Sequence, residues 1–265
     1  MAYVKCLMNV VSSTLPDGKT VTPTDDVSIL LACAGRTETY TTISALLADA
    51  TALAGVISSN NAIDYLVRST TFASDVCADQ GAMADIGANN YASDTLLANS
   101  TWLTAICGST YFESVLNVKV PVMTSNTTPS GVASAENAET SYPAWYAFDN
   151  NASSFWSSST TGTTVTAYLQ YEFDSDVSVN KVVVTGRSTQ SDRTITNTKI
   201  ERINADTTLT TLINDNTAHI ASTPYTLIFT NNSKVNKYRA TFTMTRASAT
   251  HLQIQELQFY GRADV

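Results

Sequence analysis

The sequence has few of the side chains from which catalytic centres are usually built. Only two histidines occur in 265 residues, His219 and His251, and neither has a nucleophile beside it. The motifs GxSxG and HExxH and a phosphate-binding loop are all missing, which disfavours a catalytic triad, a zinc protease and a nucleotide-dependent enzyme. A glycosidase carboxylate pair remains open, but no segment is left over for a catalytic domain. We therefore expect a protein that is not an enzyme.

Charge is also scarce, at 14% of residues, whereas 43% are hydrophobic. This balance supplies apolar material for sizeable cores and too little charge for general disorder. Residues 1–118 carry four Lys/Arg and eleven Asp/Glu, and residues 119–265 carry eleven and twelve, which gives net charges of −7 and −1. Neither part has the basic stripe that a phosphate backbone requires, so no nucleic-acid partner is expected.

Long apolar runs are missing, and cysteine is rare. No run approaches 18 residues, and Met1–Val11 is too short and too polar for a secretory signal, so we expect no membrane insertion and synthesis in a cytoplasm. The cysteines lack CxxC spacing and have no histidine near them, which makes a zinc site improbable and favours buried thiols over disulfides. They are Cys6, Cys33, Cys77 and Cys107.

The first 38 residues form a leader that is too small to be a stable domain alone. Tyr3–Val11 is typical of a β-strand, and Leu15–Gly18 (LPDG) is typical of a turn. Val27–Ala34 is apolar and fits either a second strand or a short helix. Two interpretations stay open for residues 1–38: a segment that attaches to another protein, or an N-terminal cap on the helical region beyond it.

Residues 39–118 repeat with a period of ten. One position of the decad always holds a helix N-cap residue type: Thr39, Asp49, Ser59, Ser69, Asp79, Asn89, Asn99 and Ser109. Seven residues further on, each decad has a large aliphatic side chain: Leu46, Val56, Leu66, Val76, Ile86, Leu96, Ile106 and Leu116. One continuous helix would need about 3.33 residues per turn and would contain several glycines, so we predict discrete helices of about seven residues joined by tight links.

Helices this short are not stable alone, so they must stack on neighbours or on copies from other subunits. A single row would leave much apolar surface exposed, which is rare on monomers, whereas a cyclic arrangement of copies would bury it. The decads resemble the Ser/Ala-rich ten-residue repeats of bacteriophage tail-fibre and related virion proteins. That resemblance implies a homotrimer, with residues 39–118 as the oligomerisation segment.

Beyond Asn117 the helical period gives way to an alternation of period two. Leu169, Tyr171 and Phe173 share one face, and further short alternating segments follow up to the C-terminus. Several short strands separated by turns predict an antiparallel β-sandwich over residues 119–265. In the last strand Leu252 and Ile254 set one face, but Leu257 and Phe259 have slipped by one residue. A bulge at Gln255–Glu256 would absorb this slip and direct Glu256 sideways.

Two separated motifs carry a more specific signal. Ala147–Trp156 reads AFDNNASSFW, and Glu256–Gly261 reads ELQFYG. Together they resemble the discoidin-like domain (coagulation factor 5/8 type C), also known as the family 32 carbohydrate-binding module. The resemblance covers about Val120–Arg262 and implies an eight-stranded jelly roll.

The same resemblance implies a structural Ca²⁺. Its ligands here would be Asp149, Asn151, Ser154 and Glu256, a set of hard oxygen donors that suits Ca²⁺. This sequence departs from the family pattern, because Asn150 replaces the usual Gly and Ser154 replaces the usual Thr. In the alternative interpretation, Asp149 only closes an Asx-turn and Glu256 pairs with a basic residue.

The family also implies sugar recognition by loops at one end of the sandwich. A pyranose needs an aromatic face for its apolar side and charged or amide groups for its hydroxyls. The candidate glycan-binding residues are Tyr142, Trp145, Arg187, Asp192, Arg193 and His219. The alternative for each is an ordinary solvated loop residue. We expect Phe148 and Trp156 to be core residues.

These features favour a bacteriophage fibre, spike or decoration protein that is made in the host cytoplasm and acts outside the cell. Its partners would be other virion proteins and a host cell-surface carbohydrate. One alternative is a purely structural virion assembly protein that binds no sugar. Another is the glycan-binding accessory module of a secreted enzyme, against which the missing signal peptide and catalytic domain argue.

Overall fold

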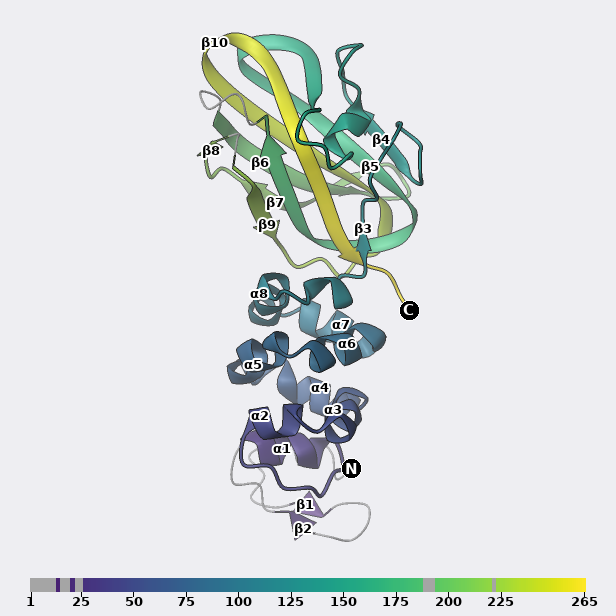
Figure 1. Cartoon of the computed structure of the whole chain (residues 1–265), viewed down its shortest axis with the longest axis vertical. Helices are drawn as coiled ribbons and strands as arrows, with labels where there is room; N and C mark the ends of the chain where they lie inside the picture. Colours follow the sequence, from purple (N-terminus) through teal and green to yellow (C-terminus); the bar gives the residue numbers. More distant parts are fainter. Residues whose placement is uncertain (1–12, 15–19, 22–25, 188–193, 221–222) are drawn as a thin grey trace. The chain divides into compact units, whose positions relative to one another are not determined.

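The computed structural model describes residues 13–14, 20–21, 26–187, 194–220 and 223–265 (Figure 1). The strand expected at Tyr3–Val11 and the turn expected at Leu15–Gly18 lie outside the described residues. The chain forms two compact units, Met1–Asn117 with Asp264–Val265, and Val118–Ala263. None of the described helices has the length and apolarity needed to cross a membrane.

The first unit is mostly helical. It begins with two short paired strands, β1 (Ser13–Thr14) and β2 (Thr20–Val21). The segment that fitted either a strand or a helix is a helix, α1 (Asp26–Cys33). Short helices follow at intervals of about ten residues: α2 (Ile43–Leu47), α3 (Ala50–Ile57), α4 (Asn60–Leu66), η2 (Thr70–Phe72), α5 (Ala73–Ala78), α6 (Gln80–Ala88), α7 (Asn90–Leu97), α8 (Ser100–Gly108) and η3 (Phe112–Ser114).

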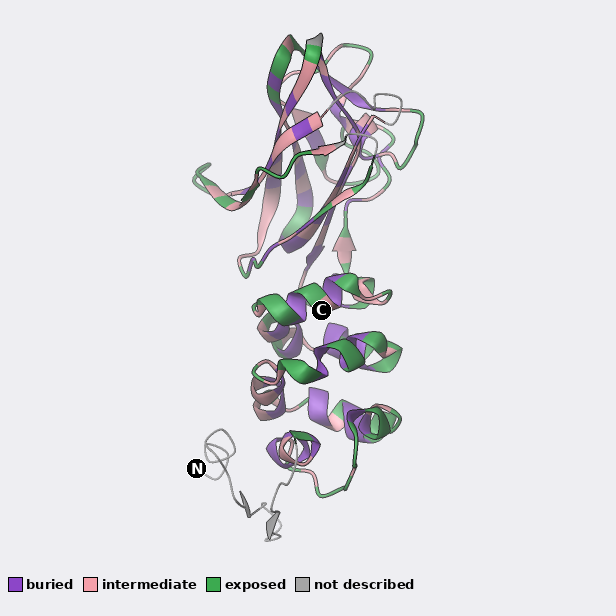
Figure 2. Cartoon of the chain, turned by 90° about the vertical axis from the view of Figure 1, so that its left-hand side faces the viewer, coloured by how far each residue is buried: buried purple, intermediate pink, exposed green. Residues whose placement is uncertain are grey.

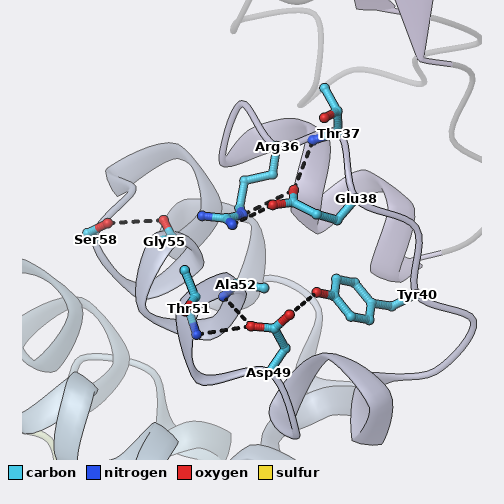
Figure 3. Close-up of polar contacts among 9 residues, drawn as sticks. All are labelled: Arg36, Thr37, Glu38, Tyr40, Asp49, Thr51, Ala52, Gly55 and Ser58. Atoms are coloured by element: carbon cyan, nitrogen blue, oxygen red, sulfur yellow. Dashed lines mark hydrogen bonds and ion pairs between the residues drawn. The ribbon is translucent and has the colours of Figure 1, made fainter.

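Most of these helices begin where the cap residues predict, because a side-chain oxygen there accepts from orphan amides of the first turn. Asp49 accepts from the N–H groups of Thr51 and Ala52, both at 3.0 Å, and its other oxygen accepts from the Tyr40 hydroxyl (Figure 3). Side-chain caps of this kind are made by Thr42, Asp49, Ser59, Asp79, Asn89 and Asn99.

The cap prediction is wrong in two decads and only partly met in a third. Thr42, not Thr39, caps the second helix, which is also shorter than expected. Ser69 makes no side-chain cap bond, and the chain passes through the 3₁₀ turn η2 before α5 begins. Ser109 accepts from the Tyr111 N–H at 3.0 Å, but only the 3₁₀ turn η3 follows.

The helices wind into a superhelix in which each one packs on the helix three places along. Helix α4 packs on α1, α7 on α4, α6 on α3 and α8 on α5, so about thirty residues complete one turn. Cap side chains also bridge successive turns. The Asn89 amide donates to the Ile57 carbonyl at 2.9 Å and the Asn99 amide donates to the Val67 carbonyl at 3.1 Å, each across 32 residues.

This winding buries the apolar positions inside one chain. The eight aliphatic side chains from Leu46 to Leu116 are between 0% and 2% exposed in a single copy of the chain. Figure 2 shows that the buried residues lie on the inner side of the helices. The expectation that copies of the chain are needed to cover this surface is therefore wrong. The prediction of a homotrimer therefore rests only on the resemblance to phage-fibre repeats. Cys33, Cys77 and Cys107 are buried thiols, as predicted, and Cys6 lies outside the described residues.

Some cap residues form both a cap hydrogen bond and a hydrogen bond to the preceding superhelical turn, and this gives a first prediction. Asn89→Ala removes both the cap bond to Ala92 N–H and the cross-turn bond to Ile57, whereas Asp79→Ala removes only a cap bond, to Ala82. A lost cap costs about 1 kcal/mol, and a part-buried carbonyl left without its donor costs about 1 kcal/mol more. Urea unfolding followed by circular dichroism should show about twice the loss for Asn89→Ala; equal losses would contradict the bridging role.

The second unit is the predicted antiparallel β-sandwich. Its elements are β3 (Val118–Lys119), β4 (Val132–Ala135), η4 (Ala144–Ala147), β5 (Trp156–Gly186), β6 (Thr194–Ile203), β7 (Leu209–Asp215), β8 (His219–Ile220), β9 (Tyr225–Ile228) and β10 (Val235–Arg262). One path runs β4-β5-β10-β6-β7, with β3 beside β10, β8 beside β6 and β9 beside β5. Figure 1 shows β10, in yellow, running through the middle of the sheet.

The long strands β5 and β10 contribute to both layers. Tyr238 lies opposite Tyr171 and Phe242 opposite Ala167, and after a change of register Leu257 lies opposite Val184. Their inward residues form one core that includes the fully buried Trp156 and Phe148, as expected. The predicted slip is present, because Leu252, Ile254, Leu257 and Phe259 are all buried and the register shifts between Ile254 and Glu256.

Candidate functional site

The turn after η4 folds around the Asp149 carboxylate. One of its oxygens accepts from the Asn151 N–H at 3.0 Å, and the other accepts from the Ser154 hydroxyl at 2.6 Å. The Asn151 side-chain oxygen in turn accepts from the Ser153 N–H at 3.0 Å. Asn150 has a positive φ of 50°, a left-handed conformation that asparagine tolerates better than most residues and that explains how it replaces glycine here.

Glu256 reaches this turn from the shifted register of β10. It accepts from the Asn150 backbone N–H, which favours its charged form, yet its pKa is raised to about 8. Burial is the main cause, and the negative charge of Asp149 is the second. The Asp149 and Glu256 carboxylates therefore lie close together and partly buried, and no basic side chain contacts them among the described residues.

The geometry agrees with one part of the alternative interpretation and differs from the other. Asp149 does close an Asx-turn, but Glu256 faces Asp149 instead of pairing with a basic residue. Among the described residues, no group of three or more His, Cys, Asp and Glu side chains could hold a metal ion. A cation here would rest on two carboxylates and on neutral oxygens such as those of Ser154 and the turn carbonyls. Such oxygen donors fit Ca²⁺, and two adjacent carboxylates are the electrostatic condition for it.

A second cluster forms around Arg187, at the end of β5. Its guanidinium carbon lies 3.9 Å from the centre of the Phe155 ring, and Nη1 donates to the Gln253 side-chain oxygen at 3.3 Å. The other face of Phe155 stacks on Tyr142, with ring centres 4.5 Å apart and planes at 20°. We call Tyr142, Phe155, Arg187 and Gln253 the arginine cluster.

Hydrogen bonds to neighbouring residues hold the side chains of the arginine cluster in place. The Gln253 amide donates to the Ser157 hydroxyl at 3.3 Å, so its oxygen faces Arg187. His251 places one ring nitrogen 2.7 Å from the Ser158 carbonyl and the other 3.2 Å from a Glu139 carboxylate oxygen. The Glu139 carbonyl accepts from the Tyr142 N–H at 2.9 Å. These contacts join the loop of Tyr142 to β5 and β10.

The structure brings two of the predicted glycan residues together, Tyr142 and Arg187, through Phe155. Trp145 instead packs against the core with one edge on Tyr146, and no described contact joins it to Arg187. His219 stacks on Tyr225 at 4.1 Å beside Asp215, also without a described contact to the cluster. Asp192 and Arg193 lie outside the described residues.

Sequence reasoning missed Phe155, Gln253, Glu139 and His251. Phe155 stands in the AFDNNASSFW motif, one residue before the core Trp156, so its position was available as a signal. Gln253 stands between Leu252 and Ile254 and therefore on the other face of the strand, where a polar residue needs no explanation. Nothing local in the sequence links any of them to Arg187.

Comparison with known proteins supports the resemblance for the second unit. The family model described as F5/8 type C domain matches residues 130–257, which include the Asp149 turn, the arginine cluster and Glu256. No curated protein matches the chain.

Several solved structures are similar to this half of the chain. The family 32 carbohydrate-binding module of Clostridium perfringens NanJ, in complex with galactose, is 19% identical with a TM-score of 0.41, over 54% of this chain and 99% of that one. CpGH89CBM32-5 from Clostridium perfringens, in complex with GalNAc-β-1,3-galactose, is 14% identical with a TM-score of 0.43, over 49% and 94%. Chitosan-binding module 1 of a Paenibacillus chitosanase/glucanase is 19% identical with a TM-score of 0.41, over 52% and 99%.

Proposed function

We propose that this chain is a non-enzymatic glycan-binding protein whose second unit holds carbohydrate at the arginine cluster. The observation that carries the proposal is the state of Arg187. Among the described residues its contacts are the neutral Phe155 ring and the neutral Gln253 amide, and no carboxylate pairs with it. A guanidinium fixed in this way keeps N–H donors and its positive charge available for a ligand.

The rest of the cluster provides what a sugar needs. Tyr142 is partly exposed and its ring stacks on Phe155, so an aromatic surface lies one ring away from the guanidinium donors. The apolar side of a pyranose packs on such a ring while its hydroxyls bond to planar polar groups. Because the ring and the guanidinium are already positioned by Glu139, His251 and Gln253, little ordering entropy is lost on binding.

We also propose that Asp149 and Glu256, with Ser154 and the carbonyl oxygens of the turn, hold a Ca²⁺ ion. The ion would supply positive charge between two like-charged carboxylates and would tether the turn to β10. Its support is the pair of partly buried carboxylates without a described basic partner. The Ser154 hydroxyl, which now donates to Asp149, would turn its lone pair toward the ion.

The wider setting is a proposal of the same kind. The ten-residue helical segments favour a bacteriophage fibre, spike or decoration protein, in which the second unit would attach to a host-surface glycan. Mass spectrometry of purified particles is the direct test, since the protein must be found in them at a fixed ratio to the other virion proteins.

Loss of Arg187 gives the test of the binding site. Arg187→Ala removes charge-assisted hydrogen bonds worth about 1.5–3 kcal/mol, so the dissociation constant for a glycan found on an array should rise roughly 10- to 150-fold. Arg68→Ala, which removes an exposed arginine of the first unit, is the matched control and should leave it unchanged. Calorimetry with the same glycan measures both, and equal affinities for wild type and Arg187→Ala would refute the proposed site.

A further inference from the structure

We infer that the outward face of the sheet formed by β4, β5, β10, β6 and β7 is a second carbohydrate-contact surface, built around Arg239, and that it takes a polysaccharide chain. The inference rests on the proposed function, because it assumes that the second unit binds glycan at all. It concerns different residues from the arginine cluster.

The face is centred on a stack between neighbouring strands. The Arg239 guanidinium carbon on β10 lies 3.9 Å from the centre of the Tyr168 ring on β5. Arg239 Nε donates to the Gln170 side-chain oxygen at 2.8 Å, and the Gln170 amide donates to the Ser134 hydroxyl of β4 at 3.3 Å. All four side chains are partly exposed, so the set faces solvent.

This set has the same composition as the arginine cluster. In each, a guanidinium carbon lies 3.9 Å from the centre of an aromatic ring, and one N–H group of that guanidinium donates to a glutamine oxygen. In each, the glutamine amide donates to a serine hydroxyl at 3.3 Å. If the first set recognises sugar by its donors and its ring, the second offers the same chemistry in another place.

The positive charge of Arg239 is also available to a ligand, because the neighbouring carboxylates pair with other residues. Its cross-strand neighbour Glu201 is buried and is bonded to Lys199 at 2.9 Å, while Lys237 nearby pairs with Glu172 at 3.0 Å. Among the described residues, no carboxylate is found within ion-pair distance of Arg239. Its contacts with the described residues are the neutral ones to Tyr168 and Gln170.

The surface is extended, so it suits a polysaccharide better than a single sugar. Ser134, Gln170, Arg239, Glu201 and Thr211 lie opposite one another in a row across five strands. Four gaps of about 4.8 Å make this row about 19 Å long. The hydroxyls of Thr166 and Thr243, bonded to each other at 2.9 Å, add further groups on the same face. Glu201 is buried, so the contacts would come from the other four side chains, and a row of this length can follow several consecutive sugars.

Two surfaces on one unit predict a difference between long and short ligands. A polymer long enough to span both surfaces gains affinity from the second contact, whereas a trisaccharide occupies the arginine cluster alone. The experiment compares galactan, alginate and chitosan, each with its own trisaccharide, against the full chain. Arg239→Ala should weaken binding of the polymer at least about tenfold and binding of the trisaccharide less than about twofold. Arg187→Ala should weaken both.

Lys237→Ala is the matched control, because it removes a positive charge from the same face that is already paired with Glu172. It should change neither affinity by more than about twofold. A melting curve like that of the wild type establishes that Arg239→Ala is folded, and Arg239→Lys, which keeps the charge without the planar fork, should lose polymer affinity as well. If Arg239→Ala keeps full polymer affinity while Arg187→Ala loses it, the second surface is refuted and the proposed function stands. If the wild type binds none of the six probes, both fall.

Discussion

Without divalent cations, the second unit should lose stability as the pH rises from about 4.5 to 8, and Ca²⁺ should reverse this trend. The group responsible is Glu256, whose pKa is raised to about 8 by burial and then by Asp149. A carboxyl with a raised pKa in the folded state binds more protons there than in the unfolded chain. Its stabilisation is therefore complete below its ordinary value of 4.5 and is lost as the pH passes through about 8.

The expected size is large, about 4–5 kcal/mol when the shift is fully developed, taking 1.36 kcal/mol for each pH unit. Thermal unfolding in chelator and in millimolar Ca²⁺, at pH 5 and pH 8, measures it. Calcium that binds only the folded state stabilises it by mass action, and most strongly where both carboxylates are ionised.

Glu256→Gln removes the charge at nearly constant shape and gives the decisive control. It should be more stable than the wild type in chelator at pH 8, less stable in Ca²⁺, and almost insensitive to both conditions. Glu136→Gln, at an exposed position of the same unit, should behave as the wild type. A wild-type melting curve at pH 8 that is the same in chelator and in Ca²⁺ would rule out the metal.

Trp102→Ala should be the most damaging substitution in the first unit. Trp102 is completely buried, and its indole N–H donates to the Leu66 carbonyl of the preceding superhelical turn at 2.9 Å. Truncation of a buried tryptophan costs about 3–5 kcal/mol, and the carbonyl left without a donor adds about 1–3 kcal/mol. The sum is a large share of the stability of a small domain.

Urea unfolding followed by helical circular dichroism tests this prediction. Trp102→Phe should lose less than Trp102→Ala, because it loses the donor but keeps part of the aromatic packing and leaves a smaller cavity. Tyr91→Ala, at a side chain that is 40% exposed, should lose little beyond its bond to Asp64. A loss under about 1 kcal/mol for Trp102→Ala would mean that the interior of the superhelix is not the packed core that the structure describes.

The sequence predicts features that depend on neighbouring residues, such as helix caps. It misses contacts between residues that are distant in the sequence. Asp49 and Asn99 were found as caps because a cap needs only its own first turn. That the Asn99 amide also reaches Val67 depends on the pitch of the superhelix, which no single decad encodes. For the same reason, the sequence led to burial between copies, where the chain buries its own helices.

The candidate sites follow the same division. Asp149 and Glu256 were paired from two motifs, and the register shift at Glu256 was visible in the alternation of the last strand. Arg187 was found from the composition of its loop. The rings and amides that hold Arg187 come from Phe155 and Gln253, which are distant in sequence and ordinary by type, so only the fold identifies them.

Glycan binding at the arginine cluster can be tested by nuclear magnetic resonance. A glycan identified on an array is titrated into ¹⁵N- and ¹³C-labelled protein while the Arg187 guanidinium, the Tyr142 ring and the Gln253 amide are followed. We predict that these signals shift together with one dissociation constant, and that Arg187→Ala abolishes the shifts of the other two. Glycan binding that moves none of the three signals would show that the sugar is held elsewhere.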